Sequence, residues 1–350
     1  MTTLRDLSRH LGLSVTQVSR ALNGHSDVSE TTRARVVAAA KAHDYHPNLS
    51  ARKLVTGRSA MVGLVLPGKP VSPDDSYFLQ MVAGLSEIFS RAGRQFVLHI
   101  ADPARNVTDG YRRLIDSGGI DGFVLLSPEL DDCRVRYLQK REIPFVIHGR
   151  VGLPPDYPFF DIDNEDVGYR LASLLTRQGH RRIAFLNGPE RQTWADWRGD
   201  GLARALGEKG VRTDPALHLR DHMTESFGML ATLQLMTSPA PPTALICGNT
   251  LILRGLMQTL TSLGLRVPED VSVVAHDDAL PEGQSAGFSP AVTVTRAPLE
   301  DAWQPLAEIL IARIEERPLG ELQRWGRVET VERGTVGPPA THPAEGCGTG

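Results

Sequence analysis

The sequence predicts two structural classes in one chain: an all-α helix-turn-helix head with a short linker helix, and then a two-lobed α/β body with parallel sheets. Two short capped helices lie within the first 22 residues. From residue 61 onward, apolar strands alternate with amphipathic helices, which is typical of parallel sheets covered on both faces. Because about 275 residues are many for one sheet, we expect two similar lobes.

The charges of the chain are distributed unevenly. Residues 1–58 carry nine Lys or Arg and four Asp or Glu, whereas the remaining residues carry 29 and 37. A basic segment on an acidic body favours contact with a polyanion. The charges alone are equally consistent with an accidental imbalance, so only the pattern of residues within the head distinguishes the two interpretations.

Targeting segments and metal sites are not predicted. No apolar run approaches the roughly 18–20 residues that span a bilayer, and the polar start has no signal-peptide core. Cys133, Cys247 and Cys347 lack the spacing of metal ligands, and an odd count suits reduced thiols. We therefore expect a cytoplasmic protein with no membrane contact, no bound metal and no cofactor.

Two capping signals divide the head into short helices. Thr3-x-x-Asp6 predicts the start of a helix, and Gly12 predicts its end. Ser14-x-x-Gln17 predicts a second helix that begins at Val15. Two helices joined by about three residues that include Gly have the spacing of a helix-turn-helix.

The second helix is predicted to be amphipathic, at about 100° of rotation per residue. Its apolar side consists of Val18, Ala21 and Leu22. Its opposite side has small polar residues and one arginine, namely Thr16, Ser19, Arg20 and Asn23. Such a side fits the major groove, because bulky side chains would prevent close approach to the bases. The first residues of the helix, Val15 and Thr16, would lie nearest to the base edges.

A third helix is expected to complete the head. Ser29 would cap its start, and it would end near His43 and Asp44. Its packing side would consist of Val36, Val37, Ala39 and Ala40.

Four segments of the head closely resemble one known family. Residues 4–8 (LRDLS), 13–23 (LSVTQVSRALN), 28–29 (VS) and 45–48 (YHPN) are similar to the DNA-binding head of the lactose-repressor and galactose-repressor (LacI/GalR) family of transcription regulators. The resemblance implies sequence-specific binding to a palindromic double-stranded DNA operator as a homodimer. The residues that it places on the DNA are Thr3, Ser14, Val15, Thr16, Gln17, Ser19, Arg20, Asn23, Asn48, Ala51, Arg52 and Leu54.

Residues 47–59 are expected to form a hinge between the head, residues 1–46, and the body. Asn48 can cap a short helix that runs to Leu54. The resemblance implies that this helix orders on DNA, that Leu54 inserts into the minor groove, and that Arg52 meets a phosphate. For an isolated sequence, an ordinary linker with one buried leucine would be the simpler interpretation.

The body, residues 60–334, contains seven strand candidates. They are residues 61–66, 96–100, 122–126, 144–147, 183–186, 244–247 and 271–274. Helices are expected between them, for example Phe78–Ala92 and Leu251–Leu263. The tail, residues 335–350, is rich in Gly, Pro and Thr and is expected to be disordered.

The body also resembles the LacI/GalR family, whose sensor has a periplasmic-binding-protein-like fold. The matching segments are residues 179–189 (GHRRIAFLNGP), Arg198-x-x-Gly201-Leu202, residues 268–274 (PEDVSVV) and Asp277-Asp278. The resemblance covers residues 2–334. It implies that the body senses a small-molecule effector and holds the dimer together.

The effector is expected between the two lobes, because ligands of such sheets bind beyond the carboxyl ends of the strands. A neutral polyol requires planar polar side chains that each bind two hydroxyls, and an aromatic face for the sugar ring. The resemblance carries the polar role onto Arg198, Asn249, Asp277, Asp163 and Asp166. The aromatic walls would be Tyr77, Phe78, Trp194 and Trp197. Outside the family frame, such polar residues mostly serve as caps, turn residues and surface ion-pair partners.

Two positions depart from the family pattern at this pocket. Thr250 stands where an acid commonly follows the Asn, and Ala275-His276 stands where Gly-Tyr or Gly-Phe commonly precedes the Asp pair. This wall of the pocket is therefore expected to differ. A sugar is the expected effector, and residues 148–150 (HGR) with 157–161 (YPFFD) resemble α-glucoside-responsive members of the family. A purine, a nucleoside or another non-sugar compound is the alternative.

Two other functional classes are disfavoured. A solute-binding protein of a transporter would share the fold of the body but would have a signal peptide and no DNA-binding head. An enzyme is disfavoured because the sequence has no phosphate loop, nucleophile elbow or paired metal ligands. The residues leave repressor and activator both open, and repression is the family default.

Overall fold

The computed structural model describes residues 2–22, 27–43, 45, 58–68, 76–152, 154–280 and 285–340, without the side chain of Ser76. The chain forms two compact units, which meet in the sequence between Ala60 and Met61. Within the described residues, no helix is long and apolar enough to cross a membrane. Of the residues expected to contact DNA, Asn23, Asn48, Ala51, Arg52 and Leu54 lie outside the described residues.

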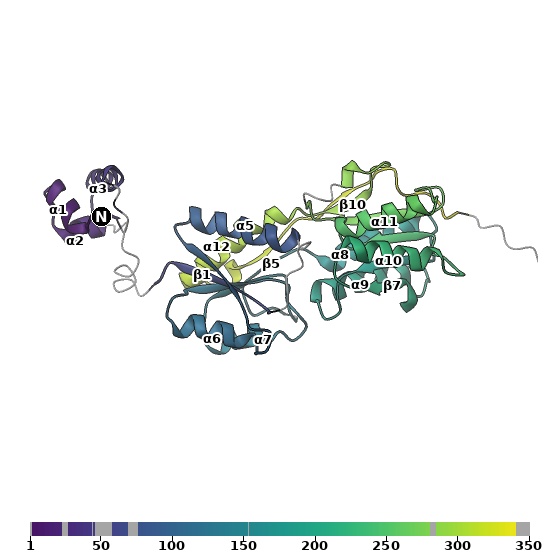
Figure 1. Ribbon diagram of the computed structural model, residues 1–350, viewed down its shortest axis with the longest axis horizontal. Helices are drawn as coiled ribbons and strands as arrows, with labels where there is room; N and C mark the ends of the chain where they lie inside the picture. Colours follow the sequence, from purple (N-terminus) through teal and green to yellow (C-terminus); the bar gives the residue numbers. More distant parts are fainter. Residues whose placement is uncertain are drawn as a thin grey trace, which may run out of the picture. The chain divides into compact units, whose positions relative to one another are not determined.

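The first unit is a head of short helices around one small core (Figure 1). Its helices are α1 (Leu4–Leu11), α2 (Val15–Leu22) and α3 (Glu30–Ala42). Leu7, Val18 and Val36, one from each helix, are fully buried in this core. The expected third helix is confirmed, with Ser29 as its N-cap, but Val37 is exposed and does not pack inside.

Both predicted capping boxes are present. In the first, the Thr3 hydroxyl accepts the N–H of Asp6 at 3.3 Å, and the Asp6 carboxylate accepts the N–H of Thr3 at 2.9 Å. In the second, the N–H of Gln17 donates to the Ser14 hydroxyl at 3.1 Å, and the Gln17 amide oxygen accepts the N–H of Ser14 at 3.0 Å. Gly12 ends α1 with a φ of 66°, a left-handed conformation that glycine adopts readily.

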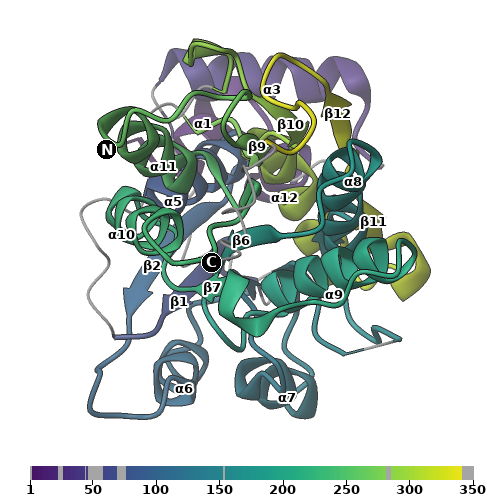
Figure 2. The same ribbon diagram turned by 90° about the vertical axis from the view of Figure 1, so that its right-hand side faces the viewer.

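The second unit contains two six-stranded sheets, each covered on both faces by helices (Figures 1 and 2). The first sheet has the order β11-β5-β4-β3-β1-β2. Its strands are β1 (Met61–Leu66), β2 (Gln95–Ile100), β3 (Gly122–Leu125), β4 (Phe145–His148), β5 (Phe159–Asp161) and β11 (Gln323–Trp325). Helices α5 (Ser76–Arg91) and α12 (Trp303–Ile314) pack on one face, and α6 (Thr108–Asp116) and α7 (Cys133–Lys140) on the other. We call this part lobe 1.

The second sheet, lobe 2, has the order β12-β10-β9-β8-β6-β7. Its strands are β6 (Ile183–Asn187), β7 (His218–Arg220), β8 (Ala244–Cys247), β9 (Ser272–Asp277), β10 (Thr293–Arg296) and β12 (Glu329–Val331). Helices α10 (Glu225–Met236) and α11 (Thr250–Ser262) pack on one face, and α8 (Asn164–Arg177) and α9 (Thr193–Gly207) on the other. Short 3-10 helices are η1 (Pro215–Leu217), η2 (Ser285–Gly287), η3 (Leu299–Ala302) and η4 (Leu319–Glu321).

The expected two lobes with parallel sheets are confirmed. Every strand pair is parallel except β10 with β12, which is antiparallel. The chain crosses between the lobes after β5, after β10 and after β11. All seven strand candidates are strands, within a few residues at their ends. The strands that the sequence missed have only three or four residues, which is too short for a recognisable apolar pattern.

The expected disorder of the tail is wrong for its first residues. Thr335 is fully buried, and its hydroxyl accepts the N–H of Thr293 at 2.9 Å. The carbonyl of Gly337 lies 2.9 Å from Nε2 of His180. Composition marked this segment as a tail because Gly and Pro form no regular element, but Thr335 and Gly337 bind the first residues of β9 and β10 in lobe 2. Residues 341–350 lie outside the described residues.

Glycines bring the helices of lobe 2 into close contact in two places. A Cβ on Gly201 of α9 would lie 2.0 Å from the carbonyl oxygen of Glu165, and one on Gly168 of α8 would lie 2.0 Å from that of Arg198. Helices α10 and α11 meet in the same way, through Gly228 and Gly255. The backbones of each pair therefore pack without side chains between them.

We predict that Gly201→Ala lowers the free energy of unfolding by about 1–3 kcal/mol, because the added methyl group meets backbone atoms that cannot move aside. Gly207, on the same helix, has no atom within 4 Å of the same position. Gly207→Ala is thus a matched control and should leave stability unchanged or raise it slightly. Thermal denaturation compares the two variants, and equal midpoints would contradict the close-packing role of Gly201.

Candidate DNA-reading and effector sites

The first half of α2 presents an open surface. Ser14, Val15, Thr16 and Gln17 are exposed, whereas Val18 is fully buried. The side chains of Ser14 and Gln17 are engaged in the second capping box, and Thr3 is engaged in the first. Val15 is 39% exposed and lies outside the head core, so its side chain could contact a thymine methyl group.

Arg20 lies on the polar side of α2, as expected, but it is not isolated there. Its Nε donates to Oδ1 of Asp27 at 3.1 Å, and its Nη2 lies 2.7 Å from Oδ2 of the same carboxylate. Ser19, its neighbour, is half-buried. The sequence analysis did not single out Asp27, because its contact with α2 depends on how the chain returns towards α3.

In lobe 2, a buried arginine organises the expected effector site. Arg198 lies in the first half of α9 and is 6% exposed. Its Nε donates to Oδ1 of Asn164 at 2.8 Å, and its Nη1 donates to the carbonyl of Gly248 at 2.7 Å. The ring of Trp194 lies 5.0 Å from the guanidinium carbon. A guanidinium has five N–H donors, so these two bonds leave donors for a ligand.

Carboxylates and an aromatic side chain surround Arg198. Burial lowers the pKa of Arg198 to about 10, while Asp278, Asp161 and Tyr77 act electrostatically in the opposite direction. Burial raises the pKa of Asp278 and of Asp161 to about 6, and Arg198 lowers both. The Asp278 carboxylate also accepts the hydroxyl of Thr250 at 3.2 Å. Groups from both lobes therefore meet at the carboxyl ends of the strands.

Lobe 1 contributes a second buried arginine. Arg150, just after β4, pairs with Asp161 through Nε at 2.9 Å. Its guanidinium lies 4.2 Å from the ring of Trp197 and 4.1 Å from the ring of Trp325. Because Trp197 belongs to α9, this stack joins the lobes. Trp197 was expected as an aromatic wall of the effector pocket, and in the structure its ring packs against the guanidinium of Arg150.

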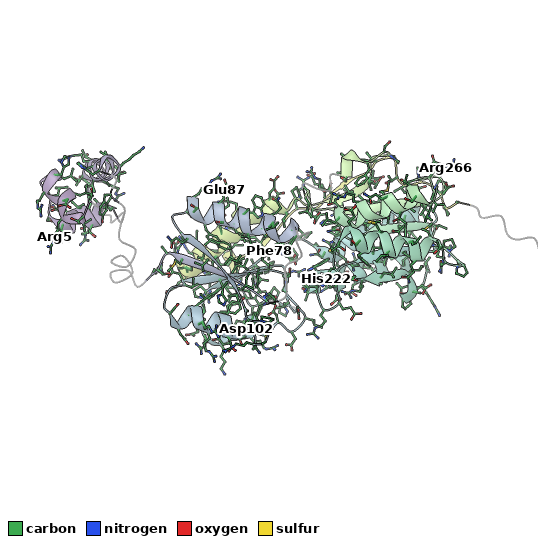
Figure 3. The ribbon with its side chains drawn as sticks, in the orientation of Figure 1. Arg5, Phe78, Glu87, Asp102, His222 and Arg266 are labelled. Carbon is green, nitrogen blue, oxygen red and sulfur yellow. The ribbon has the colours of Figure 1, made fainter. Side chains whose placement is uncertain are left out.

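Tyr77 and His148 form the aromatic part of the site in lobe 1. The Tyr77 hydroxyl lies 2.9 Å from Nδ1 of His148, and the His148 ring stacks between Tyr77 and Phe160. Phe78, labelled in Figure 3 at the start of α5, is half-buried against the core of lobe 1. Of the expected aromatic residues, Trp194 lies 5.0 Å from the Arg198 guanidinium carbon, and Tyr77 acts on Arg198 electrostatically from lobe 1.

Four of the polar residues expected to bind the effector make contacts within the protein. Asp163 is the exposed N-cap of α8, and Asp166 pairs with Arg170 at 2.5 Å. Asn249 is buried, and its side-chain oxygen caps α11. The carboxylate of Asp277 accepts the N–H of Ala279 and the hydroxyl of Ser285.

The neighbours of two expected residues also make contacts in this cluster. Asn164, beside the helix cap Asp163, donates to Asp161 at 3.1 Å and accepts from Arg198. Asp278, beside Asp277, acts electrostatically on Arg198. In the sequence, the apolar run before Asp161 was a signal that Asp161 ends a buried strand. No local pattern in the sequence distinguishes Asp277 from Asp278.

The cluster is suited to binding rather than to chemistry. It places guanidinium donors, carboxylate acceptors and an amide beside aromatic rings in a water-poor site, which is the chemistry of hydroxyl recognition. Among the described residues, no group of His, Cys, Asp and Glu is arranged to hold a metal ion.

We predict that His148 makes the fold sensitive to acid. Burial lowers the pKa of His148 to about 4, against 6.5 when exposed, so the unfolded chain binds more protons between these pH values. Stability is therefore lost as the pH falls through this window. His148→Gln should lose less stability than the parent between pH 7 and pH 4.5, as measured by thermal denaturation.

His222, an exposed residue labelled in Figure 3, offers the control for this experiment. His222→Gln should retain the acid sensitivity of the parent, because an exposed imidazole contacts water in both states. Asp161 and Asp278 have raised pKa values and act with the opposite sign, but they are present in all variants. An unchanged pH dependence in His148→Gln would show that its burial does not govern acid stability.

Comparison with known proteins identifies both units. The profile of bacterial regulatory proteins of the lacI family matches residues 3–48, and that of a periplasmic binding protein-like domain matches residues 172–336. The HTH-type transcriptional regulator AglR of Rhizobium meliloti (strain 1021) is 40% identical over 337 residues, which covers 96% of this chain and 94% of that protein.

Two solved structures share the fold. The complex of the transcriptional regulator CelR with cellobiose is 27% identical, with a TM-score of 0.68, over 96% of this chain and 100% of that one. The lac repressor dimer bound to operator and the anti-inducer ONPF is 24% identical, with a TM-score of 0.75, over 96% of this chain and 99% of that one. With its helix-turn-helix head and two-lobed α/β body, the chain belongs to the LacI family of DNA-binding transcription regulators, and it is not an enzyme.

Proposed function

We propose that this protein is a repressor which binds a palindromic operator as a homodimer in the bacterial cytoplasm, and which a neutral sugar controls through the Arg198 cluster. The single observation that carries the effector part is the buried guanidinium of Arg198, which bonds Asn164 and Gly248 beside Trp194 and keeps donors for a ligand. In this proposal, the head (residues 1–46) binds DNA, residues 47–59 form the hinge, and the body from residue 60 is the sensor.

The composition of the cluster favours a neutral polyol. Arg198 and Arg150 stand opposite Asp161 and Asp278, so the charges of these four groups balance. A strongly anionic or cationic ligand would disturb this balance in a water-poor environment. Sugar hydroxyls can donate to the carboxylates and accept from Arg198, and the ring of Trp194 offers an aromatic face. The solved CelR complex contains cellobiose, which supports the same class.

Exposed apolar side chains support the proposed homodimer. Leu79 of α5 and Ile100 of the edge strand β2 are 57% and 60% exposed, and Leu230 of α10 is 69% exposed. On α10, Met229 and Leu233 are exposed beside Leu230, and contiguous exposed apolar residues mark interaction surfaces. A second copy of the chain is the occupant that a palindromic operator requires, because two-fold symmetry in the protein matches that of the site. The related lac repressor is a dimer in its operator complex.

A ligand controls DNA binding only if it binds one arrangement of the lobes better than another. The stack of Arg150 on Trp197 is a contact that a rotation of the lobes would change, because Arg150 belongs to lobe 1 and Trp197 to lobe 2. Reciprocity then requires that operator binding changes effector affinity by the same factor.

We predict that Arg198→Ala retains operator binding and loses its response to effector, because the variant removes the main donor of the site. Asp278→Asn should weaken effector binding about tenfold to a hundredfold, the effect of a lost hydrogen bond to a charged group. Asp277→Asn is the matched control and should have a smaller effect, since its carboxylate binds Ala279 and Ser285 instead.

The measurement starts with a thermal-shift screen of cellobiose, maltose and other neutral sugars, together with nucleosides and purines. Titration calorimetry then gives the affinity of each variant for the stabilising compound, and operator binding is measured with and without it. A response that survives Arg198→Ala would place the pocket elsewhere. Stabilisation by purines or nucleosides, with no response to any sugar, would replace the sugar by the alternative effector class.

We predict that the full-length chain selects a palindrome from a pool of random duplexes and sediments as a dimer. Arg20→Ala should reduce discrimination between this operator and random DNA by about 1–3 kcal/mol, the contribution of two hydrogen bonds to guanine. Arg52→Ala, at an expected phosphate contact, should weaken both complexes alike and reduce their salt dependence. Selection of no consensus, or tight binding by a stable monomer, would contradict the proposed mode of action.

A further inference from the structure

The ion pair between Arg20 and Asp27 has a particular geometry. The carboxylate engages the guanidinium from the side, with Oδ1 at 3.1 Å from Nε and Oδ2 at 2.7 Å from Nη2. Both side chains are about half exposed, at 46% and 52%. An exposed pair of this kind contributes little to stability, because solvent screens it and two side chains lose freedom. The main role of this ion pair is therefore not to stabilise the fold of the head.

The backbones on either side of the pair are firmly placed. Arg20 lies on α2 between Val18 and Ala21, which are buried in the head core. On the other side, Val28 packs against the same core, and Ser29 caps α3 by accepting the N–H of Thr32 at 3.3 Å. Asp27 directly precedes these two anchored residues, so its carboxylate is presented to α2 by the packing of α3.

A side-on carboxylate leaves the end of the guanidinium available. The pair uses the Nε hydrogen and one Nη2 hydrogen, whereas the two Nη1 hydrogens and the second Nη2 hydrogen lie on other edges. Among the described residues, no further hydrogen bond engages Arg20. Guanine presents O6 and N7 in the major groove, and an arginine binds both through two donors. The same guanidinium can therefore bind Asp27 from the side and a guanine from the end.

We propose that Asp27 is a positioning residue for base reading: it holds the Arg20 guanidinium in one orientation, so that its free end meets a guanine. This inference rests on the proposed function. An arginine without such a partner moves among many rotamers and can bind any nearby phosphate. Asp27 restricts that movement, and its negative charge opposes contact of the pair with the phosphate backbone. Both effects raise affinity for the operator relative to random DNA.

The test measures base discrimination by the full-length chain. Duplexes selected by the parent protein define the operator, and single base-pair substitutions define the contribution of each position. Arg20→Ala identifies the base pair that Arg20 reads. Asp27→Ala should lower discrimination at that same base pair about fivefold, while affinity for random DNA stays equal or rises. Asp27→Asn keeps a neutral acceptor for Nε and should have an intermediate effect.

Two controls separate positioning from a general role in the head. Glu30→Ala removes the carboxylate of another exposed head pair, Glu30 with Arg33 at 3.4 Å, and should leave the profile of base discrimination unchanged. In the Arg20→Ala background, Asp27→Ala should have no further effect, because there is no guanidinium left to orient. If Asp27→Ala fails to fold in thermal denaturation, Asp27→Asn carries the test alone.

The outcomes distinguish this inference from the proposed function. A parent chain that selects no consensus overturns both. A consensus with unchanged discrimination in the Asp27 variants overturns the positioning role and leaves the proposed function intact. A loss that is uniform over all base pairs, that recurs in Glu30→Ala or that persists without Arg20 also overturns it, since each indicates a general effect of charge or folding.

Discussion

The cost of a buried guanidinium is the constraint on which the sensor body depends. Arg198 is 6% exposed, and a cation removed from water is tolerated only where acceptors and opposite charges surround it. The protein supplies Asn164, the carbonyl of Gly248, and the carboxylates of Asp161 and Asp278. These groups come from separate strands and helices of both lobes. The need to keep these groups near Arg198 thus restricts how the two lobes can be arranged.

The packing of glycines makes this arrangement possible. The missing side chain of Gly168 allows α8 to approach the carbonyl of Arg198 itself, and that of Gly201 allows α9 to approach Glu165. As a result, Asn164 at the start of α8 lies within 2.8 Å of the Arg198 guanidinium. The close crossing of α8 and α9, which Gly168 and Gly201 allow, therefore helps to place Asn164 beside Arg198. This explains why Arg198-x-x-Gly201 occurs as one motif: the two residues act on the same contact.

The head depends on a different kind of interaction. Its helices are short, and isolated helices of eight residues are unstable in water. Two capping boxes and a left-handed glycine satisfy the free backbone groups at the helix ends, and Leu7, Val18 and Val36 fill the core between them. Because the core takes only the apolar side of α2, the opposite side of this helix, with Thr16 and Arg20, is exposed to solvent. The pair of Arg20 with Asp27 adds order to this surface without using the core.

The sequence by itself determined the features that depend on neighbouring residues. Capping residues bind backbone groups three residues away, so Thr3-Asp6 and Ser14-Gln17 predicted the starts of the first two helices in the head. Apolar runs predicted the longer strands of both sheets. Only the tertiary structure decided which contacts the polar residues near Arg198 make. Asp163 caps a helix while Asn164 bonds Asp161 and Arg198, and Asp277 bonds Ala279 and Ser285. It also decided that residues from Thr335 pack against lobe 2 and that Asp27 holds Arg20. The physical reason is the same in each case: the partner is distant in the sequence, and its position follows from how sheets and helices pack.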